Sequence, residues 1–213
     1  MLLRKKSLKG RGLWVIFIYL CYCIVTEAVN SYYNQVFSQN SYFNFNLFTI
    51  IEYILLTMYI RRIVRNKTFR TIILVTMVLF IPYATYNLVG RYSNEFDSLS
   101  SSLESILLLI YAIFYLFEQI TKPSHIFFYA IPEFWVIVAI LLYFSGTFFL
   151  DLYAQGQLDS NVVFKYQYQV INAAFNILKN LLLGVAMVVK DNVEDNNFPK
   201  IDYSHDEHLN LNR

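Results

Sequence analysis

The apolar residues of the chain come in six long blocks separated by short polar stretches. Each block is continuous and about as long as the roughly 20 residues that a helix needs to cross a bilayer. Barrel strands would instead alternate apolar and polar positions. The pattern predicts an all-α polytopic membrane protein, a six-helix transmembrane bundle with spans at 13–29, 46–64, 71–89, 104–120, 126–150 and 166–189.

The composition fits a membrane protein, since 57% of the residues are hydrophobic, only 15% are charged, and the mean hydropathy is +0.42. We expect residues 1–190 to form the transmembrane domain and the acidic residues 191–213 to form a disordered cytoplasmic tail. The first block is preceded by basic residues and has the length of the apolar region of a signal peptide, but "TEAVNS" after it offers no convincing cleavage site. A retained first helix is therefore favoured.

The basic residues predict the orientation. With the N-terminus inside, fourteen lysines and arginines fall in inner segments and two, Arg91 and Lys165, fall in outer loops. The positive-inside rule then predicts both termini in the cytoplasm of a multi-pass protein of the cell inner (cytoplasmic) membrane. The net charge of +2 is no sign of nucleic-acid binding, because these residues act as topology signals and favour an anionic leaflet.

Polar residues on one face of the sixth block form a candidate centre. At 100° per residue they fall in a sector about 100° wide. They are Gln169, Asn172, Asn176, Lys179 and Asn180. Such a face must turn toward protein or a wet cavity. Hydrogen bonding between helices explains the asparagines, whereas a lysine near mid-membrane costs about 2.5 to 3.5 kcal/mol or more unless it is paired, wet or deprotonated.

Two carboxylates lie at suitable depths to pair with this lysine. Glu52 is roughly 18 Å and Glu133 roughly 12 Å from the inner ends of their blocks, against about 16 Å for Lys179. We therefore expect Lys179 to face inward and to approach Glu52 first and Glu133 second. Two roles stay open, an ion pair that fixes helix packing or a polar centre that binds a ligand or proton.

A second cluster is expected at the outer edge, where Glu27, Asn87 and Glu104 stand at the ends of three blocks. With Glu95 and Asp97 in the adjoining loop, they could form an acidic vestibule for a cation or a cationic ligand. The favoured alternative is that these interfacial carboxylates simply stay hydrated.

Prolines and cysteines add little chemistry. Pro82 and Pro132 remove helical hydrogen bonds and should kink the third and fifth spans. Cys21 and Cys23 point to nearly opposite sides of one helix, so they are expected to be apolar filler rather than a bridge or metal ligands.

Catalytic motifs are not found. The sequence has no phosphate-binding glycine loop, no His-Glu-x-x-His, no nucleophile elbow and no cysteine cluster. The histidines are His125 at an inner interface and His205 and His208 in the tail, where "HDEH" is a poor metal site without a scaffold. We therefore expect no enzyme, no catalytic residue, no metal and no cofactor.

The second span, "FNFNLFTIIEYILLTMYIRRIVRNK", combines Asn46, Glu52, an aromatic-rich first turn and a basic exit from Arg61 to Lys67. It resembles a span of small bacterial multi-helix membrane proteins that are often encoded beside two-component sensor kinases. The resemblance is confined to residues 43–67. It implies a sensing or accessory module without catalysis of its own.

The leading hypothesis is a sensing or accessory module that binds a small ligand or ion and contacts a cytoplasmic signalling partner. The alternative is a small secondary transporter with Lys179, Glu52 and Glu133 along its path. A lipid-modifying intramembrane enzyme is disfavoured, since the spans have neither a histidine nor paired aspartates. The expected partners are the lipid bilayer, the cytoplasmic protein and a second copy of the chain, but no nucleic acid.

Overall fold

The computed structural model describes residues 12–37, 42–91, 96–121, 131–154 and 157–189, and these ranges consist of helices and short connections without strands. The elements are α1 (Leu13–Phe37), α2 (Tyr42–Ile63), α3 (Lys67–Tyr86), the π-helix η1 (Asn87–Arg91), α4 (Ser98–Thr121), α5 (Pro132–Ala154), α6 (Gln157–Ser160) and α7 (Val162–Val188). Within the described ranges, six helices are long and apolar enough to cross a membrane. The expected six-helix bundle is confirmed.

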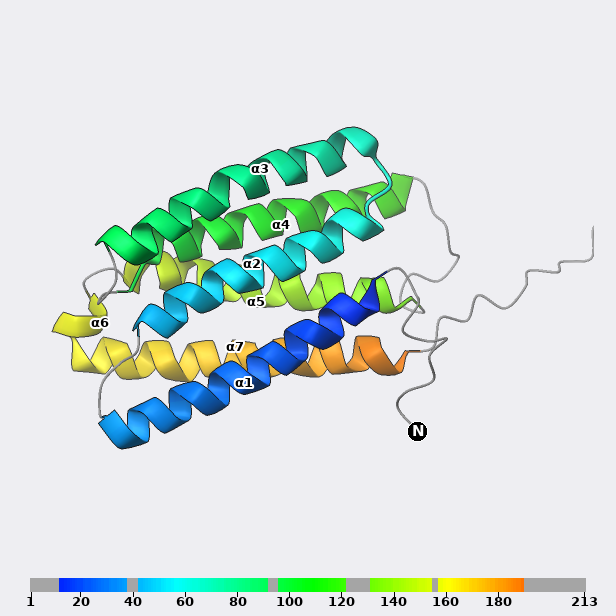
Figure 1. Cartoon of the computed structure of the whole chain (residues 1–213). Helices are drawn as coiled ribbons and strands as arrows, with labels where there is room; N and C mark the ends of the chain where they lie inside the picture. The colour runs from blue at the N-terminus through cyan, green and yellow to red at the C-terminus, as the bar shows by residue number, and fades with distance from the viewer. Residues whose placement is uncertain (1–11, 38–41, 92–95, 122–130, 155–156, 190–213) are drawn as a thin grey trace, which may run out of the picture.

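Successive long helices run in opposite directions, so all the connections between them lie at one or the other of the two ends of the bundle (Figure 1). The start of α1, the end of α7 and the α2–α3 connection lie at one end, and α6 lies at the other. We call the first the basic end, because Arg61, Arg62, Arg65, Lys67 and Arg70 lie there, and the second the far end. The positive-inside rule predicts that the basic end faces the cytoplasm; residues 1–11 and 190–213 lie outside the described ranges.

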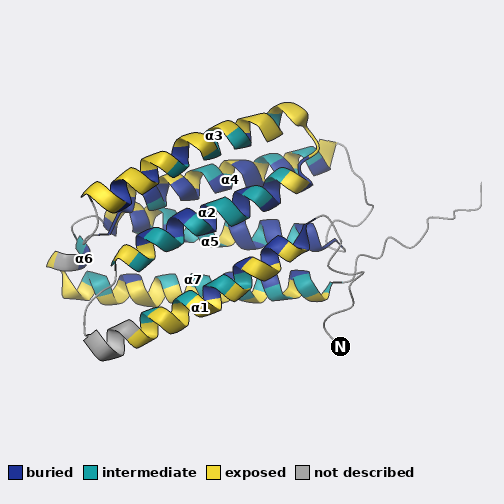
Figure 2. Ribbon diagram, viewed as in Figure 1, coloured by how far each residue is buried: buried dark blue, intermediate teal, exposed yellow. Residues whose placement is uncertain are grey.

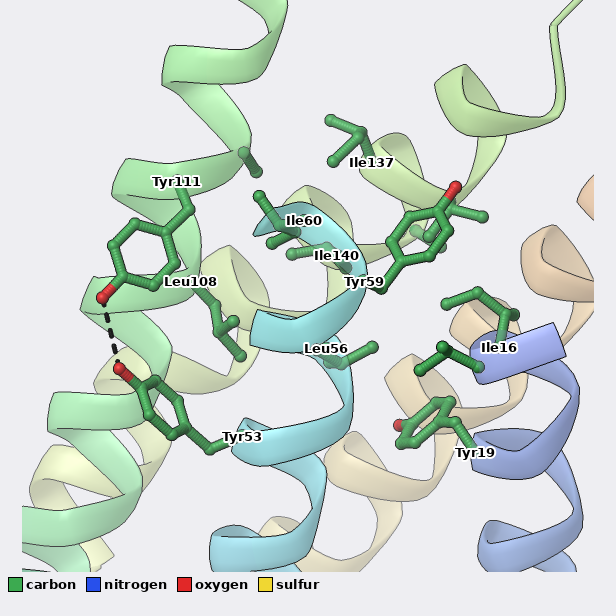
Figure 3. Packing of buried hydrophobic residues seen from close by; sticks show 14 of the residues in the cluster. Ile16, Tyr19, Tyr53, Leu56, Tyr59, Ile60, Leu108, Tyr111, Ile137 and Ile140 are labelled. Carbon is green, nitrogen blue, oxygen red and sulfur yellow. Dashed lines mark hydrogen bonds between the residues drawn. The ribbon is translucent and has the colours of Figure 1, made fainter. Parts of the chain in front are cut away.

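Helices α2, α4 and α5 form the middle of the bundle, while α1, α3 and α7 show broad exposed faces (Figure 2). The exposed faces are rich in Val, Ile, Leu and aromatic side chains, as lipid contact requires. In the interior, Leu56 and Ile60 of α2 pack toward Leu108 of α4 and toward Ile137 and Ile140 of α5 (Figure 3). The apolar packing is therefore continuous across the three middle helices.

Buried tyrosines join the helices through their hydroxyl groups. The hydroxyl oxygens of Tyr53 and Tyr111 lie 3.2 Å apart (Figure 3), and that of Tyr111 also lies 2.5 Å from Thr76 Oγ1. A buried phenol needs such a partner, because its hydroxyl has left water. One chain of three hydroxyls thus connects α2, α4 and α3.

Only the first of the six long helices starts at its predicted residue. Helices α2, α3 and α7 start a few residues earlier, at Tyr42, Lys67 and Val162, and the ends of α4 and α5 differ most from the prediction. Helix α4 starts at Ser98 rather than at residue 104, because the Asp97 carboxylate accepts the backbone N–H of Ser100 at 3.1 Å and caps it. Helix α5 starts at Pro132 rather than at residue 126. Proline is favoured in the first turn, where its missing N–H is not needed, so the predicted kink at Pro132 is wrong. Helix α3 continues through Pro82 and passes into the π-helix η1.

Candidate functional site

A buried ion pair lies near the middle of the bundle. Lys179 Nζ of α7 is 2.8 Å from Glu52 Oε1 of α2, and the two side chains are only 1% and 4% exposed. The hydroxyl of Tyr19 in α1 donates a hydrogen bond to the same carboxylate oxygen. The structure thus brings Lys179 and Glu52 together as expected, and the contact joins three helices.

Aromatic rings surround the ammonium group of Lys179. Its Nζ lies 3.6 Å from the ring centroid of Tyr143, 5.3 Å from that of Tyr19 and 5.9 Å from that of Phe48. The negative face of an aromatic ring attracts a cation, most strongly where water is excluded. The rings and the carboxylate together compensate the charge that burial removes from water.

The other polar residues of α7 divide between the interior and the surface. Asn172 Oδ1 accepts a hydrogen bond from the Tyr143 hydroxyl at 3.4 Å, and Asn176 Nδ2 donates one to Glu27 Oε1 at 3.0 Å. Asn180 is half-buried, and among the described residues its buried Oδ1 has no hydrogen-bond partner.

Gln169 is exposed, so its expected place in the polar core is wrong. The buried face of α7 is centred on Lys179, together with Tyr168, Leu183 and Ala186. Gln169 lies about 80° from Lys179 around the helix axis, on the other side of the polar sector. Because α7 lies at the periphery of the bundle, only a narrow face of it is covered.

Glu133 does not take part in the ion pair. Because α5 starts at Pro132, Glu133 is in its first turn, at the basic end, although its side chain is buried. The depth estimated from the hydrophobic block was therefore wrong. Glu52 is the partner of Lys179, and the second expected partner is removed from the centre.

A cavity of about 70 Å³ extends from the ion pair toward the far end and is lined by α1, α2, α4, α5 and α7. It is large enough for more than one water molecule. Its lining includes four carboxylates, Glu27, Glu52, Glu104 and Asp151. Tyr143 both lines the cavity and contacts Lys179, so the cavity ends at the ion pair.

The four carboxylates differ in their partners. Glu27 is exposed at the edge of the cavity, where it accepts the hydrogen bond from Asn176. Asp151 is buried and accepts hydrogen bonds from the hydroxyls of Tyr168 at 2.8 Å and Ser101 at 2.9 Å. Glu104 is 2% exposed, and within the described part of the chain its buried Oε1 has no hydrogen-bond partner.

The predicted outer cluster is only partly assembled. Glu27 and Glu104 line the same cavity, but Asn87 does not line it and donates instead to Ser100 Oγ at 3.3 Å, beside Asp97. The favoured expectation that Glu104 stays hydrated at the interface is wrong. It is buried because α4 starts at Ser98, which places Glu104 in the second turn rather than at the helix end. Glu95 lies outside the described residues.

Sequence reasoning missed four site residues, Asp151, Tyr19, Tyr143 and Tyr168. Asp151 follows the fifth apolar block, so the pattern predicts that it lies in a loop. In the structure, α5 continues through Asp151 and "LYA" and ends at Ala154. The tyrosines were counted as apolar, because a phenol ring has no polar signal in a hydropathy pattern. Their hydroxyl partners could be found only once the helices were placed.

A metal centre is not formed by the described residues, in which no group of three His, Cys, Asp or Glu side chains could hold an ion. His125, His205 and His208 lie outside the described ranges. Cys21 is exposed and Cys23 buried, and both are free. Comparison with protein families, curated proteins and solved structures gives no match for this chain.

Proposed function

We propose that the protein is a sensing or accessory module of the cytoplasmic membrane, without catalysis of its own, that binds a small ligand in the cavity and contacts a cytoplasmic partner through its basic end. The observation that carries this proposal is that the polar cavity ends at the Lys179–Glu52 ion pair. An ionisable pair inside a membrane is by default a functional candidate.

The ion pair is suited to respond to a ligand because it joins three helices. A ligand that bonds to Glu52 competes with Lys179 and Tyr19 for the same oxygen. Such competition changes the attraction between α1, α2 and α7. Each of these three helices reaches the basic end. There the guanidinium carbon of Arg62 lies 4.8 Å from the ring centroid of Trp14, a further contact between α1 and α2.

The packing on the other side of the ion pair favours sensing over transport. Between the pair and the basic end, the interior is filled by buried Ile16, Leu56, Tyr59, Ile60 and Ile137 (Figure 3). A ligand at the pair would meet close-packed side chains, which do not yield without a rearrangement. Binding without passage is the simpler use of this geometry.

The docking part of the proposal is tested by co-purification from native membranes. A variant lacking residues 191–213, with Arg61, Arg62, Arg65, Lys67 and Arg70 changed to Gln, is expected to lose a partner that the full chain retains. The matched control changes Arg91 and Lys165 to Gln at the far end and should keep it. An unchanged set of partners in the first variant would rule out docking at the basic end.

A small secondary transporter is the second candidate, favoured by the same intramembrane lysine and carboxylate. It predicts proton or substrate flux in proteoliposomes that hold the purified chain. The flux should be lost in a Lys179→Ala variant that still folds. Flux at the level of empty liposomes from the wild-type protein would leave sensing as the better explanation.

A further inference from the structure

We propose that the cavity binds a small organic ammonium ion, with the Glu104 carboxylate as its main counter-charge. This inference rests on the proposed ligand-binding function and names the chemical class of the ligand. It follows from three features of the cavity: the balance of charges, an acceptor without a partner, and aromatic walls.

Acidic side chains outnumber basic ones at the cavity. Four carboxylates are present, and Lys179 next to the cavity pairs with one of them, Glu52. Asp151 receives hydrogen bonds from hydroxyl groups, but in the described part of the chain it forms no salt bridge. Because a buried charge is costly unless it is paired, the cavity favours a ligand with positive charge and disfavours an anion.

Glu104 supplies a buried hydrogen-bond acceptor for the ligand. Its side chain is almost fully buried, it lines the cavity, and its Oε1 has no hydrogen-bond partner among the described residues. Other buried side-chain atoms of the described residues also have no partner, but Glu104 Oε1 is the carboxylate oxygen among them, and a buried carboxylate without a partner calls for an explanation. An ammonium ligand with N–H groups would give this oxygen both a hydrogen bond and an opposite charge.

The walls suit an organic cation. Six aromatic residues line the cavity: Phe45, Phe48, Phe96, Tyr143, Phe144 and Tyr168. Aromatic faces bind ammonium groups through cation–π attraction, and aromatic cages recognise methylated ammonium groups in this way. The bundle already uses this contact internally, since the Lys179 ammonium lies 3.6 Å from the Tyr143 ring centroid.

The same geometry argues against a metal ion as the occupant. Among the residues that the structure describes, no three carboxylate, thiol or imidazole groups could hold a metal ion. Hard cations such as Ca²⁺ need six or more oxygen ligands around one point. The volume of about 70 Å³ further restricts the ligand to a small amine.

The test uses the full chain, purified in detergent, and follows thermal unfolding in methylammonium, tetramethylammonium or sodium chloride at equal ionic strength. A ligand that binds only the folded state raises the melting temperature in a saturable way. We expect such a rise with at least one of the two ammonium ions and not with sodium or with neutral tert-butanol. No ammonium-specific rise, or an equal rise with sodium, would overturn the proposal.

Substitutions then locate the site. Glu104→Gln is expected to weaken ammonium binding at least tenfold, whereas Glu118→Gln, at the basic end, should leave it unchanged. If Glu104→Gln does not fold, Phe45→Leu gives a second test, since Phe45 lies on the rim of the cavity and is 39% exposed. It should weaken, several-fold, the binding of each ammonium ion that raises the melting temperature of the wild-type protein. Wild-type affinity in the variant that folds would contradict this location.

The outcomes for the ligand and for the function are separable. If ammonium ions bind but the co-purifying partners are the same with and without them, the chemistry of the site stands and sensing fails. If ammonium ions do not bind but the partner is lost on deletion of the tail and neutralisation of the basic end, the ligand class is wrong and docking stands.

Discussion

The two halves of the bundle on either side of the Lys179–Glu52 pair are built differently. The half toward the far end contains the cavity, three further carboxylates and hydroxyl partners. Directly next to the pair, the half toward the basic end is filled with isoleucine, leucine and tyrosine side chains, and its pockets lie farther out, around the ends of α4 and α5 and at the α2–α3 turn. The difference teaches that a polar cavity lies on one side of the ion pair and close apolar packing lies directly on the other, with the pair at the boundary.

The strongest test of this boundary is removal of one charge. Lys179→Met leaves Glu52 buried without its cation, and we expect a loss of about 3 to 5 kcal/mol in the free energy of unfolding. The double variant Glu52→Gln/Lys179→Met should recover most of the loss, because no charge is left unpaired. Denaturant unfolding in mild detergent measures both. A single variant as stable as wild type would show that the pair does not stabilise the contact between the helices that it joins.

The packed half is tested by truncating a side chain. Ile140→Ala should cost about 2 to 5 kcal/mol, since Ile140 is fully buried and its removal leaves a cavity. Thr26→Ala, on the wall of the existing cavity, should change stability by no more than about 0.5 kcal/mol. Equal losses in unfolding experiments would remove the contrast between the halves.

A smaller effect is expected where α5 and α7 approach closely. A Cβ atom at Gly146 would lie 2.3 Å from the ring of Phe175, so Gly146→Ala forces this ring to move at a cost of about 1 to 3 kcal/mol. Gly184→Ala in α7 is the control, because nothing lies within 4 Å of its Cβ. The melting temperatures of the two variants measure the difference. If they are equal, the close approach does not limit packing.

The smallest effect concerns the hydroxyl chain between α2, α3 and α4. Tyr111→Phe removes the group that contacts both Tyr53 and Thr76, and should cost about 0.5 to 1.5 kcal/mol. Tyr86→Phe, at a side chain that is 75% exposed, serves as control and should be neutral. A Tyr111→Phe variant that is no less stable than the control would show that the three hydroxyls do not stabilise the bundle.

The sequence predicted the bundle well because the number of spans depends only on the length and continuity of apolar blocks, and the inward turn of Lys179 depends only on the cost of charge in lipid. Which carboxylate it meets required the true helix ends. Proline at the start of α5 places Glu133 at the basic end, away from the ion pair, and the Asp97 cap at the start of α4 places Glu104 in the interior. Local capping, rather than hydropathy, decided the composition of the site.

The Glu118 side chain, near the end of α4, has a consequence for how the protein is made. Its two carboxylate oxygens accept the backbone N–H groups of Arg65 and Asn66 in the α2–α3 turn, at 2.9 and 2.8 Å. Glu118 follows Arg65 by 53 positions, so the ribosome releases the turn well before its acceptor. An α2–α3 hairpin without α4 would leave both donors to water, so this turn takes its final hydrogen bonds from a helix that is synthesised after it.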